Sequence, residues 1–289
     1  MDISYELRAR VALEAAGFRK AHALGQNFIL NESLISSLME AAGVRPDDFV
    51  LEIGPGAGVM TALLSDCCAK VLSIEIDEKL KPVLTDVLRG KENVRVEYMD
   101  AMRASVTALT HNYFGESPFR VVANLPYYIT SDVIEKLVST NLPITDICVM
   151  VQKEAAERIL SHPGTKKWCA LAATIDYFGT PEVLLDIPRT AFEPPPHVDS
   201  AFLRIGVYAE KPVQARSDEM MKRVIAAAFL MRRKKLANNL KAAFSISQEV
   251  AAACLAEAEI DADVRGEVLD IAALARLSDA ILRVRGAER

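Results

Sequence analysis

The chain places an amide, a proline and a tyrosine in consecutive positions that suit a planar amine. Asn124 and the Leu125 carbonyl both offer oxygens to an exocyclic amino group, a poor nucleophile because its lone pair is delocalised into the ring. Pro126 has a fixed φ and no N–H, so it can hold the Leu125 carbonyl inward, while Tyr127 offers a face on which an extruded base stacks. An ordinary strand that ends in a proline turn is the alternative interpretation of these residues.

A glycine-rich turn lies upstream, between a predicted strand and a predicted helix. Residues 49–53 (FVLEI) indicate a buried strand, residues 54–58 (GPGAG) a turn and residues 59–64 a helix. Glycines let the backbone turn sharply and let a ligand approach the main chain closely. The spacing G-x-G-x-G differs from the G-x-G-x-x-G of dinucleotide folds, so a nicotinamide or flavin site is disfavoured.

Two further predicted strands lead into acids. Glu75 lies near the end of the strand 70–77, and Asp100 follows the strand 94–99. A carboxylate about 20 residues after the glycines can accept both hydroxyls of a ribose, and Asp100 can accept from an adenine amino group. Single acids at strand ends are often solvated, but the ordered set of glycine turn, Glu75, Asp100 and Asn124 indicates a nucleoside-containing ligand at the carboxyl edge of a sheet.

These features resemble the S-adenosylmethionine-dependent methyltransferases of the Rossmann-like class, and within it the bacterial KsgA (RsmA) family. The segments that carry the resemblance span the chain in the family's order: residues 25–28 (GQNF), 52–56 (EIGPG), 124–130 (NLPYYIT), 152–154 (QKE), 192–200 (FEPPPHVDS) and 229–240 (FLMRRKKLANNL). The family dimethylates N6 of two adjacent adenines in the 3′-terminal hairpin of 16S ribosomal RNA during small-subunit biogenesis. The resemblance implies the same activity here.

The resemblance also implies roles for individual residues. Asn27, Ile29 and Gly56 would contact the cofactor, and Gly54 its methionine end. Glu75 would bind the ribose and Asp100 the adenine, with Asn124 serving cofactor and target amine. An adenine turned out of its hairpin would stack on Tyr127 and Phe192 and attack the methyl group in line, with no covalent enzyme intermediate. The chain departs from the family at residues 168–171 (WCAL), usually an aromatic-Gly-Arg-Leu run, and near Asp176, where the family's Gln is replaced.

Composition agrees with a cytoplasmic enzyme without a metal. Of 289 residues, 51% are hydrophobic and 25% charged, as in ordinary soluble domains. The five cysteines lack C-x-x-C spacing, which favours reduced thiols, and the four histidines are not spaced as metal ligands. No apolar run approaches the roughly 18 residues that span a bilayer, so we expect neither export nor membrane insertion.

A local basic window offsets the unfavourable net charge of −5 for an RNA substrate. Residues 211–241 hold nine Lys or Arg against two acids, a local charge of +7. The run Arg232, Arg233, Lys234 and Lys235 is the predicted phosphate contact, with Phe192 as a further RNA contact. A solvated helix end is the alternative interpretation of the basic run.

Alternating patterns predict an α/β fold in two domains. A helix near 31–42 precedes strands near 119–123, 146–151, 181–186 and 200–208, which gives a mostly parallel Rossmann-like catalytic domain over residues 1–208. Helical patterns at 220–231, 233–244, 248–257 and 271–284 predict a small all-helical RNA-binding domain over residues 209–289. A monomer that binds the small ribosomal subunit and leaves S-adenosylhomocysteine as product is expected.

Two other functions are compatible with the sequence. A 23S rRNA adenine dimethyltransferase of the macrolide-resistance type usually reads Asn-Ile-Pro-Tyr and lacks the helix equivalent to residues 229–240, so Leu125 disfavours it. A ribosome-assembly or nucleic-acid-binding factor without turnover would keep the fold, but the intact Gly54, Glu75, Asp100 and Asn124 favour catalysis.

Overall fold

A computed structural model describes residues 3–17 and 27–287 and divides the chain into two compact units. The first unit holds Met1–Ala156 and Pro181–Val207, and the second holds Glu157–Thr180 and Tyr208–Arg289. The change of unit at 207/208 lies beside the predicted domain boundary. Residues 157–180, which the sequence placed in the catalytic domain, group with the helical second unit.

The first unit is built on a seven-stranded sheet with the order β3-β2-β1-β4-β5-β7-β6. Strands β3, β2, β1, β4 and β5 are parallel, and β7 is antiparallel to β5. The bounds are β1 (Phe49–Ile53), β2 (Lys70–Glu75), β3 (Val94–Tyr98), β4 (Phe119–Ala123), β5 (Ile144–Gln152), β6 (Gly179–Ile187) and β7 (Ser200–Val207). The predicted strands and the mostly parallel sheet are thus confirmed.

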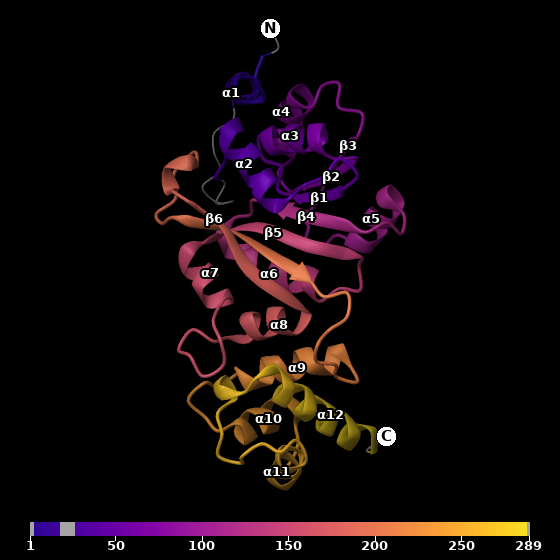
Figure 1. Ribbon diagram of the computed structural model, residues 1–289, viewed down its shortest axis with the longest axis vertical. Helices are drawn as coiled ribbons and strands as arrows, with labels where there is room; N and C mark the ends of the chain where they lie inside the picture. The colour runs from indigo at the N-terminus through magenta and orange to yellow at the C-terminus, as the bar shows by residue number, and fades with distance from the viewer. Residues whose placement is uncertain (1–2, 18–26, 288–289) are drawn as a thin grey trace. The chain divides into compact units, whose positions relative to one another are not determined.

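Helices cover both faces of this sheet, because right-handed crossovers run from β1 toward β3 in one direction and from β4 toward β5 in the other. Helices α1 to α4 lie on one face and α6 on the other (Figure 1). Their bounds are α1 (Tyr5–Ala15), α2 (Glu32–Ala42), α3 (Val59–Cys67), α4 (Lys81–Val87), α5 (Val106–Phe114), α6 (Tyr127–Val138) and α7 (Lys153–Ile159), the last reaching the unit boundary. The sequence did not predict α1, whose Ala9 and Ala12 are buried.

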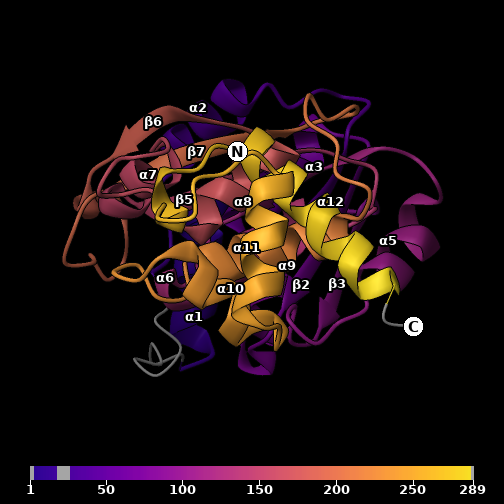
Figure 2. The same cartoon turned by 90° about the horizontal axis from the view of Figure 1, so that it is seen from below.

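The second unit is helical, as predicted. It contains α8 (Ala170–Phe178), α9 (Asp218–Ala228), α10 (Leu236–Phe244), α11 (Gln248–Glu257) and α12 (Ile271–Ala287). Helices α10, α11 and α12 lie side by side in Figure 2 and pack against one another. Helix α9 ends three residues earlier than predicted and α10 begins three residues later, so residues 232–235 form a turn between two helices and not a helix end.

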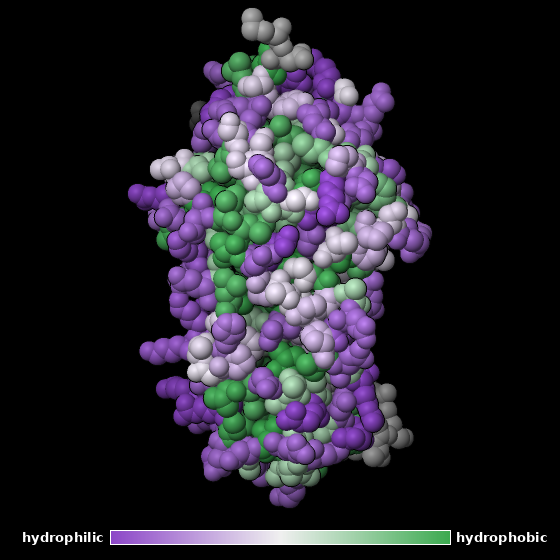
Figure 3. Space-filling model, in the orientation of Figure 1, coloured by the Kyte–Doolittle hydropathy of each residue, from purple (hydrophilic) through white to green (hydrophobic). Residues whose placement is uncertain are grey.

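Hydrophilic side chains cover most of the face shown in Figure 3, with smaller apolar areas among them. Within residues 3–17 and 27–287, every helix is too short or too polar to cross a lipid bilayer.

Candidate active site

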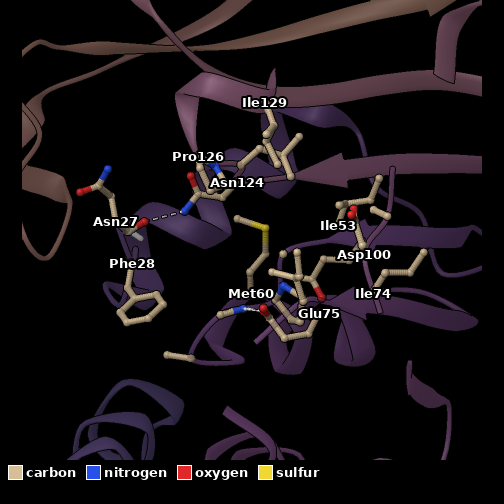
Figure 4. A pocket seen from close by; sticks show the side chains of 18 of the residues that line it. Asn27, Phe28, Ile53, Met60, Ile74, Glu75, Asp100, Asn124, Pro126 and Ile129 are labelled. Atoms are coloured by element: carbon tan, nitrogen blue, oxygen red, sulfur yellow. Dashed lines mark hydrogen bonds between the residues drawn. The ribbon is translucent and has the colours of Figure 1, made fainter. Parts of the chain in front are cut away.

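A pocket of about 290 Å³ lies at the carboxyl ends of the first four parallel strands. Because these ends meet at one edge of the sheet, the segments that follow β1, β2, β3 and β4 line the same space, together with residues 27–29 (Figure 4). Every catalytic and cofactor-binding residue proposed from the sequence lines it: Asn27, Ile29, Gly54, Gly56, Glu75, Asp100, Asn124, Leu125, Pro126 and Tyr127.

The orientation of the Asn124 amide follows from its partner. Its Nδ2 donates to the backbone carbonyl of Asn27 at 3.1 Å (Figure 4). A carbonyl can only accept, so the NH2 group must face Asn27 and Oδ1 must be the remaining acceptor. None of the described residues donates to this Oδ1. Asn124 therefore presents a fixed, unused acceptor at the pocket.

The neighbouring residues fix the platform beside Asn124. Pro126 is the N-cap of α6, and its carbonyl accepts from the Thr130 hydroxyl at 3.0 Å. The Tyr127 hydroxyl lies 2.6 Å from the hydroxyl of Ser200, which is fully buried. This anchor holds the half-buried Tyr127 ring, and burial raises the pKa of its hydroxyl. The aromatic face thus has a defined position in the pocket wall.

Glu75 joins the end of β2 to the glycine turn. Its Oε2 accepts from the Gly56 N–H at 3.1 Å and its Oε1 from the Asp77 N–H at 2.8 Å. The side chain is 4% exposed, and burial raises its pKa against the opposing effect of these donors. Each oxygen keeps a lone pair for a further donor, which suits a ligand with two adjacent hydroxyls.

The turn after β3 presents the second predicted acid. Asp100 accepts from the Met102 N–H at 2.8 Å through Oδ1, while Oδ2 lies 3.5 Å from Nε of Arg103. The Asp100 carboxylate therefore stabilises the turn that follows β3 and also lines the pocket. Strand β3 pairs with β2, which ends at Glu75.

A buried acid near the end of β1 also lines the pocket, and no role was predicted for it from the sequence. Glu52 is 1% exposed, and its Oε2 accepts from the hydroxyls of Thr61 and Ser73, both at 2.7 Å. Burial raises the pKa of Glu52 to about 7, although the two hydroxyls favour the charged form. Oε1 accepts from none of the described residues. In the sequence, the position of Glu52 just before the glycine turn indicated that it could line the pocket.

Several apolar pocket residues were also missed. Ile76 and Met102 follow the two acids, and Tyr128 follows Tyr127; each is an exposed large hydrophobic residue that lines the pocket. In the sequence, each of them lies within two residues of a residue that was predicted to line the pocket. A rim of exposed apolar side chains around a polar floor is typical of a ligand site.

Phe28 lies against the glycine turn through its ring and pairs with Glu193 through its backbone. A Cβ on Gly56, whose φ is +57°, would lie 2.9 Å from the Phe28 ring, so only glycine fits. The backbone of Phe28 pairs with Glu193 through hydrogen bonds of 3.0 and 2.8 Å. The Glu193 carboxylate in turn receives two hydrogen bonds from Arg10 of α1. Residues 25 and 26 of the GQNF motif lie outside the described residues.

The predicted RNA contacts are not part of this pocket. Phe192 is 1% exposed and packs in the hydrophobic core of the first unit, so the role of a stacking face for a base is corrected to one of packing. A loop aromatic can be buried by its neighbours, which the sequence motif does not reveal. The four basic residues belong to the second unit.

Residues 232–235 form the basic turn. Two of its four cations are paired with acids, and two have no acidic partner among the described residues. Arg232 donates to Glu267 and to the Lys166 carbonyl, both at 2.9 Å, and Lys235 donates to Asp263 at 2.5 Å. Arg233 and Lys234 are exposed and have no acidic partner among the described residues. Arg233 and Lys234 are therefore the two cations of this run that have no acidic partner among the described residues.

Known proteins resemble this chain over nearly its full length. The sequence profile of the family described as "Ribosomal RNA adenine dimethylase" matches residues 17–277. "Ribosomal RNA small subunit methyltransferase A" of Geobacillus thermodenitrificans is 39% identical over 285 residues, which cover 97% of this chain and 97% of the relative. The protein of that name from Enterococcus faecalis is 37% identical over 284 residues, covering 97% and 96%.

Solved structures share the fold. A dimethyladenosine transferase from Plasmodium falciparum aligns with a TM-score of 0.72 at 23% identity, covering 89% of this chain and 97% of its own. The 23S rRNA methyltransferase ErmE aligns with a TM-score of 0.62 at 26% identity, covering 88% and 99%. The predicted Rossmann-like methyltransferase fold with a helical C-terminal part is thereby confirmed. The chain belongs to the ribosomal RNA adenine dimethylase family, which confirms the family predicted from its motifs.

Proposed function

We propose that the chain transfers methyl groups from S-adenosylmethionine to N6 of two adjacent adenines in the 3′-terminal hairpin of 16S ribosomal RNA, dimethylating each. The observation that carries this proposal is the fixed Asn124 amide, whose Oδ1 accepts from none of the described residues and which lines one pocket with Tyr127 and three acids. The names and the near-complete coverage of the curated relatives support the small subunit as the source of the substrate.

The pocket fits S-adenosylmethionine in the chemistry of the side chains that line it. The Glu75 carboxylate has a free lone pair on each oxygen for the two ribose hydroxyls, and Asp100 accepts from the adenine amino group. Gly54 and Gly56, both at positive φ, bring the backbone of the turn to the pocket wall, where the methionine end would lie. Asn27 and Ile29 also line the pocket. When bound, the cofactor supplies a methyl group on a good leaving group.

The chain's own residues position the amine. Asn124 Oδ1 and the Leu125 carbonyl accept the two amino hydrogens, which turns the nitrogen lone pair toward the methyl group. The bound amine would take the methyl group from the donor's sulfur, with the S–C bond broken, and would release one proton to solvent. Tyr127 supports the base by stacking. The monomethylated amine keeps one hydrogen, so one acceptor suffices for the second transfer.

The second unit supplies the RNA affinity in this proposal. Arg233 and Lys234 are exposed cations without acidic partners among the described residues, which is the state that phosphate binding requires. Because the proposed substrate is ribosomal, we propose that the protein acts in the cytoplasm and binds the small subunit as a monomer. No metal ion is needed for the transfer as written.

The direct test uses small subunits that lack the two dimethyladenines. We expect the chain and labelled S-adenosylmethionine to modify those two nucleotides, mapped by mass spectrometry of nuclease fragments, with large subunits as the negative control. Label on a large-subunit adenine would instead support the 23S activity. Tight cofactor binding by calorimetry without transfer to either subunit would support a binding factor without turnover.

A further inference from the structure

Tyr128 is an exposed aromatic residue on the rim of the pocket, and the transfer chemistry leaves it without a role. Its side chain is 65% exposed, yet it lines the same cavity as Asn124 and Tyr127. None of the described residues makes a hydrogen bond or ring contact with it. An aromatic ring that is left in water beside a ligand site is a ready surface for a planar partner.

The local backbone directs Tyr127 and Tyr128 to different places. Both lie in the first turn of α6, where successive side chains diverge by about 100° around the helix axis. The Tyr127 hydroxyl is anchored on Ser200, which holds that ring in the pocket wall. The Tyr128 ring, without such an anchor, stands at the pocket mouth.

The substrate in the proposed function has a planar group that needs such a surface. Extruding one base from a stacked strand exposes a face of the adjacent base, at a cost of a few kcal/mol. Stacking of a nucleobase on an aromatic side chain recovers roughly 1–3 kcal/mol. A second platform next to the first therefore suits a target of two consecutive purines.

We propose that Tyr128 stacks on the nucleobase adjacent to the adenine being methylated, so that the aromatic pair reads two neighbouring bases. This inference rests on the proposed function of the pocket. Tyr128 acts through its ring, and its hydroxyl makes no necessary contact.

The test compares Tyr128→Ala and Tyr128→Phe on reconstituted small subunits. We expect Tyr128→Ala to lower kcat/KM for the subunit by about 5- to 100-fold, the range that such stacking gives at 1.4 kcal/mol per tenfold. Tyr128→Phe should stay within about twofold of the wild type, and the calorimetric Kd for S-adenosylmethionine should not change. Val183→Ala, at another exposed apolar residue outside the pocket lining, is the matched control.

A second substrate isolates the adjacent base. Subunits that carry an abasic nucleotide next to one target adenine should be methylated equally by the wild type and by Tyr128→Ala. An equal loss for Tyr128→Ala on both substrates, or for Tyr128→Phe and Tyr128→Ala, would overturn the stacking role. So would unchanged activity of Tyr128→Ala on the intact target. Absence of transfer by the wild type to any adenine would overturn the proposed function itself.

Discussion

The buried acid Glu52 makes the stability of the first unit depend on pH in a direction that can be measured. Its carboxyl has an ordinary pKa of 4.5 when unfolded and about 7 in the fold, because burial disfavours the charge. Between these values the folded state holds a proton that the unfolded state has lost. The free energy of unfolding therefore falls as pH rises, by about 1.4 kcal/mol per pH unit.

Glu52→Gln removes this dependence. Gln keeps the size and an oxygen that can accept from Thr61 and Ser73, but it never ionises. The wild type should lose roughly 3 kcal/mol relative to the variant between pH 4.5 and 7, with no further change above pH 8. Ser73→Ala should extend the loss to higher pH, because the Ser73 hydroxyl favours the charged form.

The assay must report the first unit. The single tryptophan, Trp168, lies in the second unit, so its fluorescence is unsuitable. Hydrogen exchange of peptides from β1 and β2, compared between wild type and Glu52→Gln at each pH, measures the required difference. A difference that stays constant from pH 5 to 8 would show that Glu52 ionises normally and would refute the reasoning.

Four further perturbations address the pocket and the basic turn. Asn124→Ala should abolish transfer in single-turnover assays while cofactor binding persists; activity within a few-fold of wild type would contradict its role. Glu75→Gln should weaken S-adenosylmethionine by roughly 1.5–3 kcal/mol in calorimetry, and an unchanged Kd would place the cofactor elsewhere. Gly56→Ala should lower both Tm and cofactor affinity because of the Phe28 ring at 2.9 Å, whereas Gly90→Ala, also at positive φ but in open space, tests backbone strain alone. Replacing Arg233 and Lys234 with Gln should lower the slope of log K for subunit binding against log salt concentration by roughly 1.4–1.8. Replacing the paired Arg232 and Lys235 with Gln should lower it less, and equal slopes would contradict the distinction.

The pocket could be predicted from the sequence because parallel strands bring their carboxyl ends together. Glu75, Asp100 and Asn124 each follow a separate strand, so their spacing along the chain and the strand pattern together place them at one edge. The glycine turn was recognisable for the same reason. Such a pocket can be predicted from the order of the strands and the residue types at their carboxyl ends alone.

Burial in loops and ends of helices could not be predicted in this way. Phe192 sits in a proline-rich segment without periodicity, so nothing in the pattern distinguishes a packed ring from an exposed one. The basic run continues a helical pattern, but the chain turns at residues 229–235 and begins α10 only at Leu236. Likewise, the hydroxyl partners of Glu52 come from α3 and β2, which are distant in the sequence.

The division of charge between the two units follows from what each must bind. Ribose hydroxyls and a cationic methyl donor favour the carboxyl groups of Glu52, Glu75 and Asp100 in the pocket, and these same groups repel phosphate. Exposed phosphate contacts are screened within about 8–10 Å at physiological salt, so a basic turn can act although the chain carries −5 overall. Because Glu267 and Asp263 already pair with Arg232 and Lys235, we propose that the phosphate affinity of this turn comes from Arg233 and Lys234. In this proposal an acidic chain binds RNA through one turn of one unit.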